Sequence, residues 1–462
     1  MKKKTLLLGV LLATLLQGAK ADVDPNFYIY LCFGQSNMEG NATPESIDKT
    51  GVPERFKMLA CVNFNNPKRT MGQWYTAVPP LVREGTGLGM ADWFGRTMVQ
   101  SLPDVTIGVV DVAIGGTKIE GFMQEEVGKY IASMNPSSES WLINYFKAYD
   151  NDPYKRLVDM AKIAQQSGVI KGILLHQGCS NNGQSDWPQK VKKIYDRLMN
   201  DLSLNPAEVP LFVGETVSAE MKGSCSAHNA VIATMPRVIP NSYVISSKDC
   251  PQRGDGLHFT ASGYRMMGYR YAVAALSTLG VKPPYFSFNE GAIIPNAKCT
   301  YTSSSRTMNA TDEGGMLTWT YADGADWSDS KYLVIKLKKK QTCDTEVWIY
   351  NFTSSKLVLS YKAKIGDQTT LVVDLQNAKY NTTKLNSAKI GKMLFRATQK
   401  GTIVFDDVFL SNDEQYAPTA ISNISIDGPF EAPLYSLDGR LAQPDALKPG
   451  IYVRSGKKMV IK

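Results

Sequence analysis

Short apolar runs alternate with helix-like patterns over the first 280 residues, and this alternation limits the possible folds more than any other feature. Five runs are typical of short buried strands: Phe27–Phe33, Val105–Val112, Ile170–Leu175, Leu211–Thr216 and Tyr243–Ser247. Helical patterns occur at Gly89–Ser101, Pro153–Gln166, Asp186–Leu202 and Ala261–Leu279. Strands that alternate with helices form a parallel sheet covered on both faces. The sequence therefore predicts a three-layer α/β/α domain with a five-stranded parallel sheet over residues 22–281.

The pattern changes after residues 281–284, where two consecutive prolines end the last helix and mark a linker. Alternating stretches such as Tyr332–Leu337, Glu346–Tyr350 and Thr402–Leu410 follow. They predict a β-sandwich of the jelly-roll type over residues 285–413. Residues 417–462 have a second strand-and-turn style and predict a small separate β segment. Three tryptophans of this half either pack in the sandwich core, which we favour, or stack on sugar rings: Trp319, Trp327 and Trp348.

The first 21 residues have the pattern of a secretory signal peptide. Three lysines precede a short apolar stretch, and Ala19-Lys20-Ala21 supplies an A-x-A cleavage site. Removing this segment takes away four lysines, so the net charge of +8 falls to 8 − 4 = +4. That charge is too small to indicate nucleic-acid binding. The apolar stretch is too short for a good membrane span, and no later segment is long and apolar enough. The sequence thus predicts an exported protein.

Seven cysteines are present, and an odd number leaves at least one thiol free. In an exported protein, disulfides are allowed. Proximity in the sequence favours Cys225 with Cys250, and Cys299 with Cys343. No pair has the spacing of metal ligands, so we expect no metal.

Ser36 is a candidate nucleophile. It lies in Gly34-Gln35-Ser36-Asn37-Met38-Glu39-Gly40, directly after the first strand. Open parallel sheets bind ligands at the carboxyl ends of their strands, and glycines there permit a tight turn and close approach of a substrate. A polar turn without catalytic function is the alternative.

His258 is the candidate general base, in the loop before the last helix. Only three histidines exist, and Asp255 lies three residues before His258. A turn of that length brings the carboxylate to the imidazole, where it would orient the ring while the other nitrogen takes the serine proton. The alternative is a helix-capping loop. His176 and His228 we interpret as structural, and Glu215 as an ordinary carboxylate at a strand end.

Two further strand ends offer donors for an oxyanion hole. Gly115 and Gly116 follow the second strand, where a backbone N–H could face a developing oxyanion. A plain tight turn is the alternative. Gln177 follows the third strand, and its amide could donate to the same oxyanion. Gln35 and Asn37, which flank Ser36, are candidate substrate-binding residues.

In this order, these motifs resemble the SGNH-hydrolase superfamily, whose fold is flavodoxin-like. More narrowly, they resemble the branch of sialate O-acetylesterases and carbohydrate esterase family 6, the acetyl xylan esterases. The resemblance covers about residues 26–280. It implies that Ser36 is the nucleophile, His258 the base and Asp255 the supporting acid, with an oxyanion hole from Ser36, Gly115 or Gly116, and Gln177. Many relatives have an acid after His-Gln-Gly, where this chain has Cys179.

The second half resembles other modules. Residues 286–412 resemble a jelly-roll carbohydrate-binding-like module, and residues 417–462 resemble the C-terminal sorting domain of the type IX secretion system. Together the resemblances imply a secreted or cell-surface carbohydrate O-acetyl esterase that needs no cofactor, with an acetylated glycan as substrate. A general short-chain esterase and a non-catalytic glycan-binding protein are the alternatives.

Overall fold

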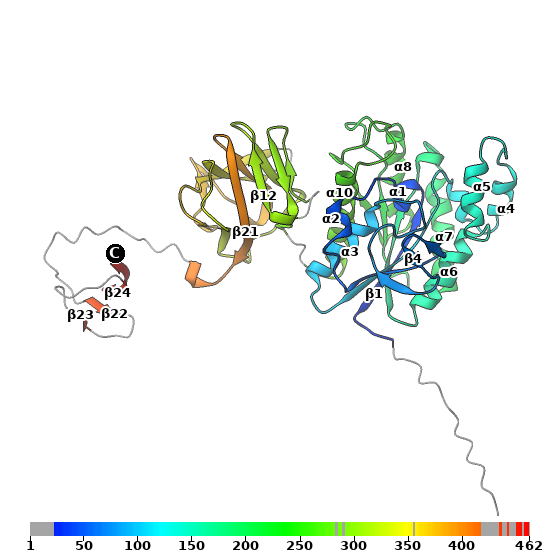
Figure 1. Ribbon diagram of the computed structural model, residues 1–462, viewed down its shortest axis with the longest axis horizontal. Helices are drawn as coiled ribbons and strands as arrows, with labels where there is room; N and C mark the ends of the chain where they lie inside the picture. The colour runs from blue at the N-terminus through cyan, green and yellow to red at the C-terminus, as the bar shows by residue number, and fades with distance from the viewer. Residues whose placement is uncertain are drawn as a thin grey trace, which may run out of the picture. The chain divides into compact units, whose positions relative to one another are not determined.

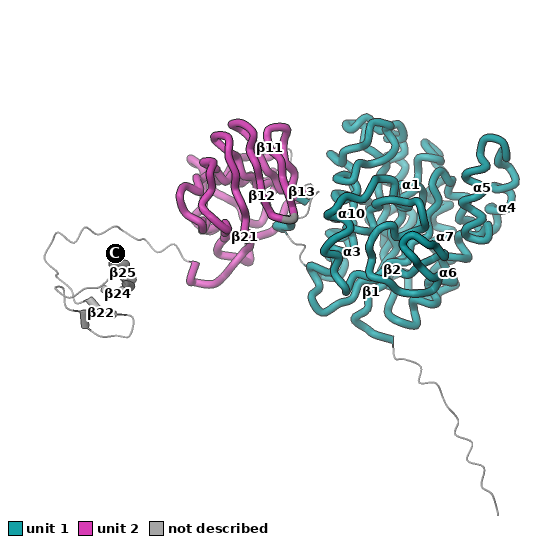
Figure 2. The backbone as a smooth tube through the Cα atoms, in the orientation of Figure 1, with its two compact units in different colours: residues 1–292 teal, residues 293–462 magenta. Residues whose placement is uncertain are grey.

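A computed structural model describes residues 23–281, 285–288, 292–353 and 356–416, and strands at 434–436, 441–442, 450–454 and 457–461. The chain divides into two compact units, residues 1–292 and residues 293–462 (Figure 2). The predicted signal peptide at residues 1–21 lies outside the described residues.

The first unit is built on one mixed sheet of seven strands, six of them parallel. In spatial order the strands are β5 (Trp74–Thr76), β2 (Phe56–Leu59), β6 (Thr106–Ala113), β1 (Phe27–Gly34), β7 (Val169–His176), β8 (Leu211–Gly214) and β9 (Ser242–Ile245). The five predicted strands are confirmed, but a sheet of only five is wrong. β2 and the antiparallel edge strand β5 are short, with four and three residues. Runs of that length carry no clear periodic signal.

The four predicted helices are confirmed as α3 (Met90–Ser101), α6 (Pro153–Ala164), α7 (Trp187–Asp201) and α10 (Ala261–Thr278). Local capping sets two of their starts. The Asp152 side chain accepts a hydrogen bond from the Lys155 N–H ahead of α6, and the Thr260 hydroxyl does the same for Gly263 ahead of α10.

Shorter elements complete this unit: α1 (Ser36–Glu39), α2 (Ser46–Lys49), β3 (Phe64–Asn65), β4 (Lys68–Arg69), η1 (Ile119–Phe122), α4 (Val127–Ala132), α5 (Ser140–Lys147), η2 (Cys179–Asn181), η3 (Ser226–His228), α8 (Asn229–Ile232) and α9 (Met235–Val238).

Helices cover both faces of the sheet (Figure 1). Successive side chains of a strand point to opposite faces, so the Tyr30 and Phe33 side chains of β1 lie on opposite faces of the sheet. The Tyr30 ring packs edge-on against Phe94 of α3, with 4.8 Å between centroids, and Phe33 packs against Phe122 of η1 at 5.3 Å. Both rings are buried. The central strand therefore has a core on each side.

Three strands end at the same level. Gly34, the last residue of β1, pairs with Ala113 of β6 on one side and with His176 of β7 on the other. The loops that leave these strands consequently start side by side, and the loop after β9 leads from the same edge into α10. This edge holds the residues that the sequence singled out.

The second unit contains two antiparallel sheets of five strands each. One has β10 (Ile294–Pro295), β13 (Met316–Ala325), β20 (Ile390–Ala397), β15 (Thr345–Phe352) and β16 (Leu357–Lys364), and the other has β11 (Cys299–Thr302), β12 (Thr307–Ala310), β21 (Gly401–Ser411), β14 (Tyr332–Leu337) and β17 (Thr370–Asp374). The Phe395 ring of the first sheet lies 4.6 Å from the Phe405 ring of the second. Shorter elements are η4 (Ser303–Ser305), the β18 (Lys379–Tyr380) and β19 (Thr383–Lys384) pair, η5 (Ser387–Lys389) and η6 (Glu414–Tyr416).

The three tryptophans of this unit differ in burial. Trp319 and Trp327 are buried, so the core interpretation is confirmed for them. Trp348 is half-buried, and the cationic groups of Lys362 and Arg396 lie 5.1 and 5.6 Å from its ring centroid. Sugar stacking by Trp348 stays a prediction, whereas burial excludes it for Trp319 and Trp327.

Within residues 417–462, four strands are described: β22 (Leu434–Ser436), β23 (Leu441–Ala442), β24 (Gly450–Arg454) and β25 (Lys457–Ile461). They form one antiparallel sheet in the order β23-β22-β24-β25. Over the described part of the whole chain, we find no helix with both the length and the apolar character of a bilayer span. All seven cysteines are free thiols, so neither of the two disulfides favoured by the sequence is formed.

Candidate active site

Ser36, His258 and Asp255 form one continuous chain of hydrogen bonds at the carboxyl edge of the sheet. Ser36 is the first residue of α1, directly after β1, and its Oγ lies 2.9 Å from His258 Nε2. The other ring nitrogen, Nδ1, lies 2.8 Å from Asp255 Oδ2. With Nδ1 protonated and donating to the carboxylate, Nε2 is an acceptor for the serine proton. Ser36 thus meets two residues that lie 219 and 222 positions after it in the sequence, in the arrangement of a serine hydrolase.

The Asp255 carboxylate is held by its own loop. Its Oδ1 accepts the backbone N–H groups of Leu257 and His258, at 2.8 and 2.9 Å, and its Oδ2 also accepts Arg253 Nε at 2.7 Å. Burial would raise the pKa of Asp255, but the hydrogen bonds from His258, Leu257 and Arg253 outweigh it and hold this pKa below the ordinary range. The acid therefore stays ionised when it faces the imidazole.

Asn37 ties the serine turn to the histidine loop. Its Nδ2 donates to the Leu257 carbonyl at 3.0 Å, and its Oδ1 accepts the Tyr264 hydroxyl of α10 at 2.6 Å. The side chain is buried and both of its ends are used within the protein. These two bonds fix the distance between Ser36 and His258. The substrate-binding role of Asn37 stays a prediction.

Gln35 and Gln177 are likewise used internally. Gln35 Oε1 accepts the Gly178 N–H at 3.0 Å and the Gln177 amide at 3.2 Å. The Gln177 Nε2 also lies 3.2 Å from the Thr117 carbonyl and 2.7 Å from Asn181 Oδ1, and the residue is fully buried. Because these acceptors engage the Gln177 amide and the residue is fully buried, its N–H groups point into the protein in this structure. The substrate-binding role of Gln35 stays a prediction, since only its Oε1 is engaged in these bonds. The two side chains join the loops after β1, β6 and β7.

Glu39 is a site residue that the sequence analysis did not single out. It belongs to α1, is buried, and accepts a hydrogen bond from Arg83 Nε at 3.1 Å. Burial raises the pKa of Glu39, opposed by Arg83 and by the Gly115 backbone N–H. The sequence feature that could have identified Glu39 is its charge within the otherwise uncharged segment Gly34–Gly40. Since the Gly115 N–H faces Glu39, the Gly116 N–H is the remaining candidate in this turn for donating a hydrogen bond to the oxyanion.

The remaining histidines do not contact Ser36. His176 Nε2 donates to the Glu215 carbonyl at 2.9 Å, and burial lowers the pKa of His176 to about 4. Burial also lowers the pKa of His228 to about 4, and this ring packs against Trp187. The Glu215 carboxylate accepts the Ser247 N–H at 2.9 Å. These three residues support the loops around the site, as the sequence indicated.

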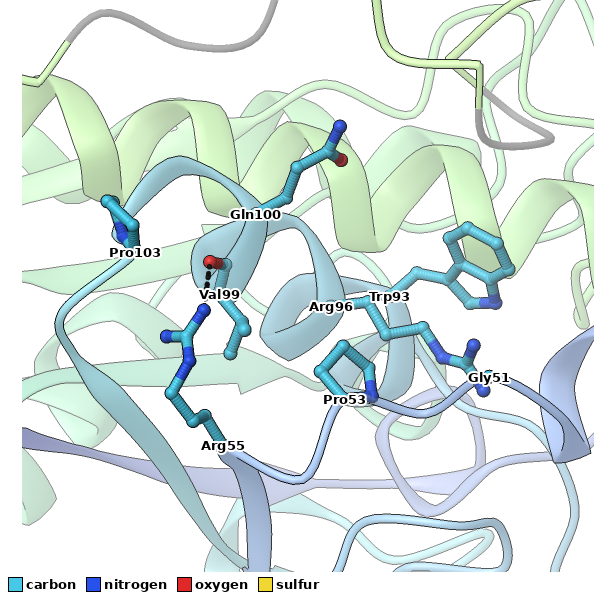
Figure 3. Close-up of a pocket in the computed structure, with 8 residues that line it drawn as sticks. All are labelled: Gly51, Pro53, Arg55, Trp93, Arg96, Val99, Gln100 and Pro103. Atoms are coloured by element: carbon cyan, nitrogen blue, oxygen red, sulfur yellow. Dashed lines mark hydrogen bonds between the residues drawn. The ribbon is translucent and has the colours of Figure 1, made fainter.

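A pocket of about 400 Å³ lies elsewhere, beside α3, and carries no catalytic set (Figure 3). Its two arginines, Arg55 and Arg96, are directed at backbone carbonyls such as those of Val99 and Thr50. Their charges are therefore engaged by the protein itself. Among the described residues, no group of three or more histidine, cysteine or carboxylate side chains is placed to hold a metal ion.

Ser36, His258 and Asp255 are the residue types of a serine hydrolase, and they lie together at the strand ends of an α/β sheet. The family model described as "Carbohydrate esterase, sialic acid-specific acetylesterase" matches residues 26–277, more than half of the chain. The chain belongs to this family of carbohydrate esterases and is a carboxylic-ester hydrolase.

The chain is also similar to several solved structures. One is a protein from Arabidopsis thaliana, with 20% identity, 55% of this chain and 99% of that chain covered, and a TM-score of 0.41. A carbohydrate acetylesterase from Xanthomonas citri has 13% identity, 83% and 80% coverage, and a TM-score of 0.39. NanS has 15% identity, 56% and 99% coverage, and a TM-score of 0.41.

Proposed function

We propose that this protein is a secreted carbohydrate O-acetyl esterase that works through a Ser-His-Asp acyl-enzyme mechanism. The single observation that carries the proposal is the hydrogen-bond chain from Ser36 Oγ through His258 to Asp255. Family membership supports a glycan ester as the substrate class.

The proposed reaction has two stages. In the first, Ser36 Oγ attacks the acetyl carbonyl while His258 Nε2 takes the serine proton, and the proton then passes to the leaving sugar hydroxyl. An acetyl-Ser36 ester remains. In the second, His258 removes a proton from water as it attacks the ester, and then returns that proton to Ser36 Oγ as acetate leaves. The ionised Asp255 stabilises the imidazolium in both stages.

The oxyanion of each stage needs donors that are fixed in advance. The Ser36 backbone N–H, at the start of α1, is one candidate, and the Gly116 N–H is the other. Gly115 lies close to the nucleophile, because a Cβ added to it would stand 3.7 Å from the Ser36 Cβ. The turn after β6 is therefore near enough to take part.

The other parts of the chain suggest where the enzyme acts. The basic and apolar start of the sequence supports export, and the strand-rich ending supports type IX secretion to the outside or the cell surface through the periplasm. Two five-stranded antiparallel sheets in the second unit support the jelly-roll, carbohydrate-binding-like module. Xylan, as in carbohydrate esterase family 6, and O-acetyl sialic acid are the candidate substrates.

Acetate release from a panel of acetylated glycans tests the proposal. The panel holds partially acetylated xylo-oligosaccharides, 9-O-acetyl-N-acetylneuraminic acid and the aliphatic ester triacetin. Ser36→Ala should lower turnover by several orders of magnitude. The matched control is Ser242→Ala, a buried serine of β9.

Each possible result decides between the functions considered. Turnover of Ser36→Ala within about tenfold of the wild type would exclude Ser36 as the nucleophile. Activity on triacetin alone would favour a general short-chain esterase. Glycan binding without any acetate release would favour a binding protein.

A further inference from the structure

Trp141 is an exposed aromatic side chain beside the candidate active site. It belongs to α5, and 46% of its surface is exposed. Among the described residues, six large apolar side chains are exposed to this degree or nearly so, and Trp141 is the only tryptophan in that set. Exposing an indole to water is unfavourable, and one ring beside a catalytic serine is a candidate contact for substrate.

The indole lies over the turn after β6. A Cβ added to Gly116 would stand 2.5 Å from Trp141 Cη2 and 3.2 Å from Cζ3, so the six-membered ring covers this glycine. Gly116 has a φ of +77°, and the neighbouring Gly115 approaches Ser36. The position covered by the indole and the position beside the nucleophile are thus consecutive residues of the turn.

A row of contacts fixes the indole in place. The Trp141 ring packs edge-on against Tyr145, with 5.6 Å between centroids. The Arg83 guanidinium lies 3.7 Å from the Tyr145 ring centroid and pairs with Glu39 of α1. The row therefore runs from the exposed ring back to the helix that carries Ser36. A ring held in this way loses little conformational entropy when a ligand binds.

We propose that Trp141 stacks on the pyranose ring of the sugar whose acetyl ester is cleaved, and so selects glycan esters over small aliphatic esters. The inference rests on the proposed function. Sugar rings have an apolar face of C–H groups, which an exposed indole can cover without a charge partner. Arg83, the nearest cation of the row, is engaged by Glu39, so the stacking contact itself is neutral.

Trp141→Ala, Trp141→Phe and the control Tyr243→Ala test the proposal. Tyr243 is 41% exposed and lies on the edge strand β9, so it matches Trp141 in exposure but not in position. Steady-state acetate release is measured on partially acetylated xylotetraose, 9-O-acetyl-N-acetylneuraminic acid and triacetin. We expect Trp141→Ala to raise KM at least tenfold on the better glycan with kcat changed less than threefold. The loss of kcat/KM on triacetin should be at least fivefold smaller, and Trp141→Phe should restore most of the glycan activity.

A binding measurement separates this inference from the proposed function. Calorimetric titration of Ser36→Ala, with and without Trp141→Ala, uses the same two glycans and needs no catalysis. Affinity that falls tenfold or more in the double variant supports stacking. Unchanged affinity, no binding by Ser36→Ala, or equal kinetic losses on glycan and triacetin would overturn it. A wild type that cleaves no ester would overturn the proposed function, while the titration pair still decides on Trp141.

Discussion

Asp255→Asn should nearly abolish ester hydrolysis, because an amide cannot satisfy the groups that surround this carboxylate. Oδ1 accepts two backbone N–H groups, from Leu257 and His258, and Oδ2 accepts Arg253 Nε and His258 Nδ1. An asparagine must place its NH₂ toward one of these pairs of donors. Facing the backbone, it meets the N–H groups of Leu257 and His258, which the loop fixes and which would lose their acceptor. If the NH₂ group instead faces the side chains, it meets Arg253 and His258, which can both rearrange.

The second orientation should prevail. Arg253 is 46% exposed and can turn to water, and His258 can move its proton from Nδ1 to Nε2. With the proton on Nε2, the ring donates toward Ser36 Oγ and cannot accept the serine proton. We expect kcat/KM to fall about 10⁴-fold, or about 5 kcal/mol of transition-state stabilisation. Acetate release at pH 7.5, with circular dichroism to confirm folding, measures the effect. Glu215→Gln is the control, with a change below about threefold. A loss under about tenfold for Asp255→Asn, or a larger loss for Glu215→Gln, would refute the reasoning.

Three further outcomes are expected. The pKa of His176 is about 4 in the folded protein and about 6.5 when unfolded, so its stabilising contribution is complete above pH 6.5 and is lost toward pH 4. Urea unfolding should show the wild type losing about 3 kcal/mol more than His176→Gln between pH 7 and 4; parallel profiles would contradict this. Burial, with Asp92 and Glu39, raises the pKa of Asp111 well above its ordinary value, and its carboxyl oxygens lack a hydrogen-bond partner in the described structure. Stability from this group is lost as pH rises, so Asp111→Asn should gain stability relative to the wild type from pH 4 to 8, and a gain independent of pH would count against a protonated carboxyl group. Deleting residues 417–462 should leave turnover of the purified enzyme within about twofold, because every candidate site residue lies before position 259. The same deletion should trap the enzyme in the periplasm of its host; normal export would exclude the sorting role, and a folded but inactive product would exclude the domain boundary.

The elements that sequence patterns predicted are those with long, regular signals. β1, β6 and β7 each have eight residues of nearly continuous burial, and the helices α3, α6 and α7 carry a clear helical period. β2 and β5 were not predicted, because these short strands form only by pairing with other strands of the sheet. β2 pairs with β6 on one side and with β5 on the other. Both partners are separated from β2 in the sequence, so the residues of β2 alone do not reveal the pairing.

The catalytic candidates were accessible from the sequence for a different reason. Ser36 and His258 are reactive residue types at strand ends, so topology alone brings them to one edge. Gln35, Asn37 and Gln177 stand at the same edge, but their amides bond within the protein. Whether a polar side chain faces a substrate or a neighbouring loop depends on packing over more than a hundred residues of separation. No local pattern carries that information.

The loop after β7 has Cys179, and not a carboxylate, directly after His176-Gln177-Gly178. The hydrogen bond with Cys225 and burial raise the pKa of the Cys179 thiol, which therefore stays neutral and cannot support an imidazolium. Asp255 instead combines a low pKa with direct contact to His258 Nδ1. A carboxylate at position 179 would add a second negative charge near Asp255, and like charges in one site raise the pKa of one partner. We infer that Asp255 carries the acid role in this chain, and that the neutral Cys179 leaves that carboxylate ionised.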